Sequence, residues 1–175
     1  MMATAFSWLV FIGAGLVAIV ASLLMVTRRN PVHSALWLIL AFISLAIIYL
    51  SLNAQFIAVA QAIVYAGAIM MMILFVIMLI VLEAEQELTR KITGAKIIGA
   101  FITIILFLEV IAAVLSFQVT GTKGPFTPEM LDSYGNVKAV GMMLYGKYMF
   151  PFEIASILLL IGIVGAVVLS KRRKE

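Results

Sequence analysis

Residues 56–82 form an apolar run of 27 residues that contains no charged side chain. Only Gln61, Tyr65 and Gly67 interrupt its series of aliphatic, methionine and phenylalanine side chains. At about 1.5 Å per residue, a helix of this length measures roughly 40 Å, whereas the hydrocarbon core of a bilayer is about 30 Å thick. The run therefore predicts a membrane-spanning helix with surplus length, whose polar groups need an environment other than lipid.

Four further apolar segments predict additional spanning helices, at residues 6–26, 32–52, 97–117 and 152–169. With 65% hydrophobic and 11% charged residues, the chain is too apolar for a soluble protein. We therefore expect an all-α, multi-pass integral membrane protein with five transmembrane helices, folded as a single membrane domain over residues 1–175. Residues 118–150, rich in glycine and proline, are expected to form its one long loop. No basic leader precedes the first apolar segment, so we expect it to be retained.

The distribution of basic residues predicts the orientation of the chain in the membrane. With five spans the two ends lie on opposite sides, and nine of the 12 Lys and Arg residues fall on the side of the C-terminus. The positive-inside rule then places the N-terminus and residues 118–150 outside and the C-terminus in the cytoplasm. Topology thus explains the basic tail, which favours the lipid bilayer over nucleic acid as its partner.

The residue types that are missing exclude several kinds of chemistry. The chain has no cysteine, so it supplies no disulfide, thiolate cluster or iron–sulfur ligand. Its single histidine, His33, is too few for a conventional zinc or bis-histidine haem site. We therefore expect no catalytic residue, cofactor or metal in this chain, and any redox chemistry belongs to a partner.

Two carboxylates lie within the predicted spans. Glu109 is near the middle of the fourth, where an ionised group costs at least a few kcal/mol, so it should face protein or water or be protonated. Proton handling and a hydrogen-bonded structural role are both open for it. Glu153 follows Pro151 in the expected first turn of the fifth helix, where the helix dipole explains a carboxylate without any further function.

The polar residues of the 56–82 segment lie close together. Gln61 and Tyr65 are four residues apart and so share one face of an α-helix, where the amide and the phenol can bond to each other, to a chain of waters or to another helix. Gly67 weakens the helix locally, and with the surplus length it predicts a kink or a π-bulge near Tyr65. Met70 and the two methionines after it are typical of adaptable packing rather than of a metal site.

Three ordered segments resemble the J subunit family of bacterial NADH–quinone oxidoreductase, the respiratory complex I. They are Gln61 to Met70 with its continuation to Met78, the Asn30-Pro31-Val32-His33-Ser34-Ala35 start of the second helix, and Leu144 to Tyr148 followed by Pro151 to Leu160. Independently of this resemblance, Asn30 predicts an N-cap and Pro31 a first helical residue.

The resemblance implies a core subunit of the membrane arm, located in the bacterial inner membrane and carrying no cofactor of its own. FMN, iron–sulfur clusters and quinone then belong to partner subunits, and the A, H and K subunits are the expected neighbours. The family's third helix is thought to switch between α-helical and π-bulged forms, which opens or closes a water path for protons. Carried over, Tyr65, Gly67 and Met70 fall in this gate, Gln61 stands where some members have Glu, and Glu153 matches the family's Phe-Glu pair.

Two other functions fit the same residues. A homo-oligomeric proton or cation transporter or channel would use Glu109 as its coupling carboxylate. The equivalent subunit of a related ferredoxin-fed or F420-fed complex would keep the fold and change the electron donor. The quinone reductase subunit is favoured because only one carboxylate lies deep in a span and because small-residue faces on several helices call for different neighbours.

Overall fold

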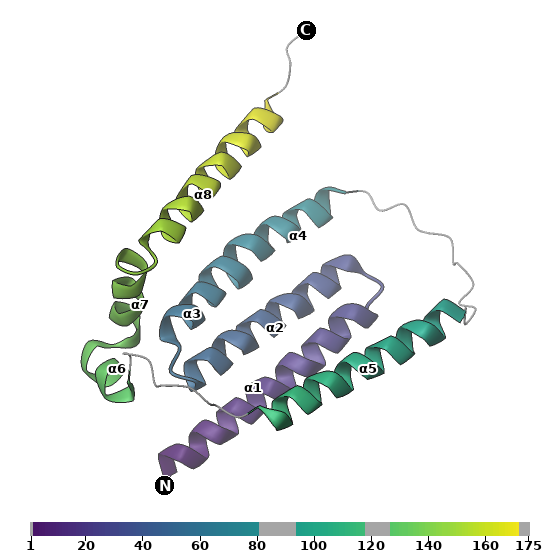
Figure 1. The fold of residues 1–175 in the computed structure, drawn as a ribbon. Coiled ribbons are helices and arrows are strands. Elements are labelled where there is room, and N and C mark those ends of the chain that lie inside the picture. Colours follow the sequence, from purple (N-terminus) through teal and green to yellow (C-terminus); the bar gives the residue numbers. More distant parts are fainter. Residues whose placement is uncertain (1, 81–93, 118–126, 172–175) are drawn as a thin grey trace. The chain divides into compact units, whose positions relative to one another are not determined.

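The computed structural model contains the five long apolar helices that the sequence predicts (Figure 1). It describes residues 2–80, 94–117 and 127–171, and in these ranges it contains helices and turns but no strand. The third span begins as predicted, while residues 81 and 82 of its expected end lie outside the described ranges. The spanning helices are α1 (Met2–Thr27), α2 (Pro31–Ser51), the continuous series α3 (Gln55–Ala60), η1 (Gln61–Ile69) and α4 (Met70–Leu79), then α5 (Gly94–Ser116) and α8 (Met149–Ser170).

The start of α2 confirms the predicted N-cap. The side-chain oxygen of Asn30 accepts hydrogen bonds from the backbone N–H groups of Val32 at 2.9 Å and His33 at 3.4 Å, and Pro31 is the first helical residue. The cap therefore satisfies N–H groups that have no partner within the helix. The Ser34 hydroxyl also donates a hydrogen bond to a backbone carbonyl near the end of α1, which ties the two helices into a tight hairpin.

α2 is the central helix of the compact unit formed by residues 1–79 and 126–175. It contacts α1 as well as α3, η1 and α4. Its buried residues are all small, which lets neighbouring helices approach closely, as is typical of packing in membranes. They are Ala35, Ala41, Ser44 and Ala46. Residues 80–125, which include α5, form a second unit.

The described part of residues 118–150, which begins at residue 127, contains two short helices where the sequence predicts only a loop. These are α6 (Pro128–Tyr134) and α7 (Asn136–Tyr145), and both are too short to span a membrane. Gly135 separates them with a φ of +79°, a conformation that residues with a side chain rarely adopt. α7 is attached to the third span, since the Asn136 side-chain oxygen accepts a hydrogen bond from the Phe56 N–H at 3.0 Å.

The large apolar side chains of all five spans are mostly exposed, and no residue of α8 is buried. Soluble monomers rarely expose apolar surface of this extent, so lipid or other helices must cover it. The fold thus positions the third span against α2 and leaves most of the remaining helical surface available for a membrane environment.

Candidate functional site

A π-helical segment, η1, lies in the middle of the third span. It comprises Gln61–Ile69, the region in which the sequence predicts a kink or a π-bulge near Tyr65. At its end the backbone N–H of Met70 donates to the carbonyl oxygen of Tyr65, five residues earlier, whereas an α-helix pairs residues four apart. The predicted irregularity is therefore present, and π-helical turns of this kind occur frequently at functional sites.

Gly67 suits this geometry because it has no side chain. A Cβ atom at this position would lie 3.3 Å from the carbonyl oxygen of Ala62, which is closer than most Cβ contacts in proteins. The close contact arises from the π-helix, which stacks each residue over the one five positions earlier. In an α-helix the N–H of Gly67 would instead meet the carbonyl of Ile63. A side chain at position 67 would thus crowd the Ala62 carbonyl oxygen in the π form.

Gln61 and Met70 are both buried, with 8% and 0% of their surfaces exposed. Within the described residues of their unit, η1 and α4 contact no helix other than α2 and the neighbouring parts of their own span, so α2 covers both side chains. In an α-helix, residues nine positions apart point in opposite directions, because nine steps of about 100° end half a turn away. The wider π turns bring Gln61 and Met70 onto the same face, toward α2.

Tyr65 packs edge-on against Phe42 of α2, with ring centroids 5.8 Å apart and an interplanar angle of 66°. The phenol remains 48% exposed, and in the described ranges no hydrogen bond joins it to Gln61. The shared face expected from α-helical spacing is therefore replaced by one buried and one half-exposed side chain. The sequence offers no signal that singles out Phe42 as the partner of Tyr65.

An apolar groove lies between the start of α2 and the part of the third span that runs from the end of η1 through α4. Its volume is about 580 Å³, and no polar side chain lines it. The lining residues are Val32, Leu36, Ala68, Met71, Met72, Leu74, Phe75 and Met78. The three methionines are flexible side chains that adapt to different neighbours, so this wall of the groove can be repacked at low cost. α4 is apolar on every side, and a rotation of this helix exchanges one apolar wall for another.

The two predicted carboxylates lie on other helices. Glu153 is exposed on α8, and because α8 begins at Met149 it falls in the second turn. The expected position in the first turn is thus wrong, and with it the explanation by the helix dipole. The backbone carbonyl oxygen of Glu153 accepts a hydrogen bond from the Ser156 hydroxyl at 2.7 Å. Glu109 is exposed on α5, which belongs to the unit of residues 80–125, whereas η1 belongs to the other unit.

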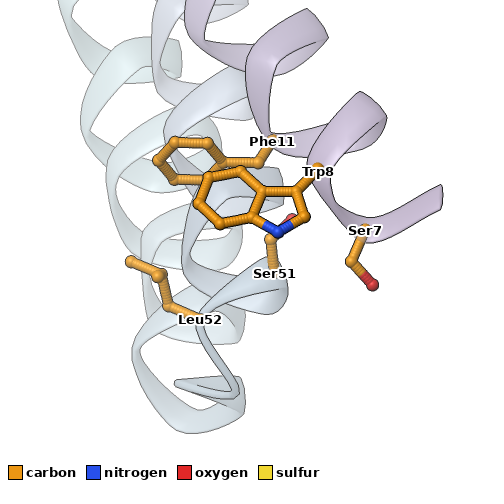
Figure 2. A pocket seen from close by; sticks show the side chains of 5 residues that line it. All are labelled: Ser7, Trp8, Phe11, Ser51 and Leu52. Atoms are coloured by element: carbon orange, nitrogen blue, oxygen red, sulfur yellow. The ribbon is translucent and has the colours of Figure 1, made fainter. Parts of the chain in front are cut away.

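A second hollow, of about 260 Å³, lies between the N-terminal part of α1 and the end of α2. Figure 2 shows the Trp8 and Phe11 rings above Ser51 and Leu52, and the two rings meet edge-on at 6.1 Å. No titratable side chain lines it. Among the described residues no group of three His, Cys, Asp or Glu side chains is placed to hold a metal ion. The best candidate site in the described residues is therefore η1 with its contacts to α2.

Five apolar spans, one of them with a π-helical centre, define a polytopic α-helical membrane protein. The sequence profile of NADH-ubiquinone/plastoquinone oxidoreductase chain 6 matches residues 21–169. This chain belongs to that family.

Similar proteins carry the corresponding bacterial name, NADH-quinone oxidoreductase subunit J. The protein from Escherichia coli K12 is 38% identical over 155 residues, which cover 87% of this chain and 80% of that protein. Those from Rickettsia typhi and Rhodobacter capsulatus are each 32% identical and cover 90% of this chain, with 77% and 78% of their own lengths matched. These relatives favour a subunit of the respiratory complex over a stand-alone transporter.

Proposed function

We propose that this chain is a non-redox core subunit of the membrane arm of a proton-pumping NADH–quinone oxidoreductase. It would lie in a bacterial inner membrane with its N-terminus outside and its C-terminus in the cytoplasm. The A, H and K subunits are its proposed neighbours, and partner subunits would hold FMN, the iron–sulfur clusters and quinone. Its proposed task is to couple quinone reduction to proton translocation through a change in the third span. The observation that carries this proposal is the π-helix at Gln61–Ile69.

A π-helical turn holds more residues than an α-helical turn, because its hydrogen bonds join residues five apart rather than four apart. Conversion of η1 into an α-helix would remove this surplus. If the residues before Gln61 stay in place, the helix that follows rotates by one residue, or about 100°. Ile69 then takes the place of Met70 against α2, and Ile73 takes that of Leu74. Because each exchange replaces one large apolar side chain by another, both forms bury similar apolar surface and their free energies stay close.

The two forms would differ in whether water can enter the span. In one form, a chain of hydrogen-bonded waters would pass the Gln61 amide and the Tyr65 phenol and conduct protons. In the other form, the apolar segment 69–75 would close this path. Gln61 does not titrate, so it relays a proton through hydrogen bonds instead of storing one. Glu153, Glu109 and carboxylates of adjoining subunits would hold protons along the path. Quinone chemistry in a neighbouring subunit would bias the switch through a local change of charge.

Thiol labelling in the intact complex tests the switch directly. Because the chain has no cysteine, Met70→Cys and Ile69→Cys each introduce the only thiol of this subunit. In the π form Met70 is buried and Ile69 is less so, so a membrane-permeant maleimide should label position 69 faster. During turnover with NADH and quinone the ratio of the two rates should fall. Val20→Cys on α1, which is exposed, serves as the control whose labelling stays constant.

A labelling ratio that is identical at rest and in turnover would contradict the switch. Purification in mild detergent tests the assembly itself. Co-purification with subunits that carry flavin and iron–sulfur clusters supports the proposal, whereas a homogeneous oligomer of this chain alone would contradict it.

A further inference from the structure

The outward face of α7 is apolar and aromatic although the helix lies between two membrane spans. Ala139 is only 5% exposed, whereas Tyr145 is 69% exposed and Val137 and Met142 are also exposed. A short helix surrounded by water would gain from the opposite arrangement, since exposed apolar side chains add nothing to its stability there. The pattern instead fits a helix that lies in the interface of a membrane.

The attachments of α7 place it at the boundary of the membrane. α7 contacts α3 (Figure 1), and Asn136 at its start accepts the hydrogen bond from Phe56, the second residue of the third span. α7 ends at Tyr145, and the spanning helix α8 begins four residues later, at Met149. α7 is therefore fixed at both ends to points where spans begin.

Two lysines lie on this helix and on the turn that follows it. Lys138 Nζ is 5.1 Å from the centroid of the Tyr134 ring, and Lys147 Nζ is 6.0 Å from that of Tyr148. Both distances fall in the range of cation–π contacts. Neither α7 nor the turn that follows it, residues 136–148, contains an acidic residue, and the two acidic residues of the 127–152 stretch, at positions 129 and 132, belong to α6.

We infer that this face of α7 binds anionic phospholipid headgroups. We define the α7 face by the residues Val137, Lys138, Met142, Tyr145, Lys147 and Tyr148. Its apolar side chains enter the boundary between headgroups and acyl chains, the tyrosines lie at the level of the headgroups, and the lysines extend to the phosphates. Lysine is depleted in the cores of protein interfaces, whereas at a membrane surface lysine and tyrosine can both bury an apolar body and keep a polar tip in water, which favours lipid over a partner protein.

Photocrosslinking in the intact complex distinguishes the two occupants. The complex, with p-benzoylphenylalanine in place of Tyr145, is reconstituted into vesicles of equal parts phosphatidylglycerol and phosphatidylethanolamine, and the adducts of this subunit are identified by mass spectrometry. Phosphatidylglycerol adducts should exceed phosphatidylethanolamine adducts. Combining Lys138→Gln with Lys147→Gln should lower this ratio by about fivefold for each lysine removed. Lysine-to-arginine changes at both positions should preserve it.

Lys171→Gln, at the far end of α8, is the matched control and should leave the ratio unchanged. Adducts with another protein subunit would overturn the inference. A ratio that does not respond to the two glutamine substitutions would overturn it as well. The result is independent of the proposed switch, because the probe and both lysines lie outside the third span.

Discussion

Gly67→Val is the substitution that most directly tests the role of the π-helix. A Cβ atom at position 67 would lie 3.3 Å from the Ala62 carbonyl oxygen, and valine adds two methyl groups beyond that atom. This contact with Ala62, five residues earlier, belongs to the π form. Forcing extra carbon atoms into a packed site costs about 1–3 kcal/mol. An equilibrium between the π and α forms would therefore move toward the α form by about 5- to 150-fold.

Three quantities are measured in the same membranes: the amount of assembled complex, its turnover, and the labelling ratio at positions 69 and 70. The Gly67→Val complex should assemble normally, because an α-helix tolerates valine at a small cost in helix propensity. Quinone-coupled NADH oxidation and proton pumping should both fall by a factor in the same range if each cycle passes through the π form. In the labelling experiment, position 70 should gain reactivity relative to position 69 already at rest. Gly67→Ala should give a smaller effect of the same sign.

Gly13→Val on α1 is the matched control, since a Cβ atom there would meet nothing within 4 Å beyond the neighbouring turns of its own helix. It should leave turnover and labelling unchanged. A Gly67→Val complex with normal turnover, normal pumping and an unchanged labelling ratio would refute the idea that the π form is needed.

Substitutions at three further positions test the roles of individual residues. Tyr65→Phe keeps the ring contact with Phe42 and should slow coupled turnover without loss of assembly. Normal pumping in this variant would exclude a required role for the phenol. Tyr65→Leu also removes the aromatic pair, which contributes about 0.5–1.5 kcal/mol, and should lower the thermal stability of the complex. Gly135→Ala places a side chain at a φ of +79° and should weaken α6 and α7 by about 1–3 kcal/mol, seen as faster hydrogen exchange in residues 128–145, whereas unchanged exchange would contradict the assigned strain. Glu109→Gln should reduce pumping with normal assembly if the carboxyl carries protons, and full pumping would leave it a structural role.

The sequence predicts the parts of the fold that depend on strong local signals. Long apolar runs are visible without any knowledge of neighbours, and the Asn30-Pro31 pair carries its own capping geometry, so both predictions are confirmed. α6 and α7 are hidden because two short helices of mixed polarity lack such a signal. The misplacement of Glu153 has a related cause, since apolarity predicts Phe152 as the start of α8, whereas its backbone becomes helical at Met149.

The contact face of the third span could not be predicted for a different reason. A helix usually reveals its buried side through the periodicity of its apolar residues, but α4 has no polar residue on any side. The structure shows that Met70 is the buried residue, and that this position depends on the extra residue in η1. An α-helical third span with the same sequence would bury Ile69 in its place, and composition alone does not distinguish the two.

This lack of a preferred face is also what a switching helix requires. A span with one apolar stripe and one polar face would be held in a single register, because rotation by about 100° would move polar groups against α2 at a cost of roughly 1–3 kcal/mol for each group left unpaired. Between Ala66 and Leu79 every residue except Gly67 is apolar, so rotation leaves no polar side chain unpaired. The free-energy difference between the two registers then depends only on packing and on the geometry at Gly67. Introducing one polar residue at a position that is exposed in the π form and half-buried in the α form should therefore favour the π form. Met72→Asn is such a change, because Met72 is 62% exposed and the rotation moves it to the place of the half-buried Ile73. The labelling ratio at positions 69 and 70 would then stay constant through turnover, whereas Met72→Leu should preserve its response.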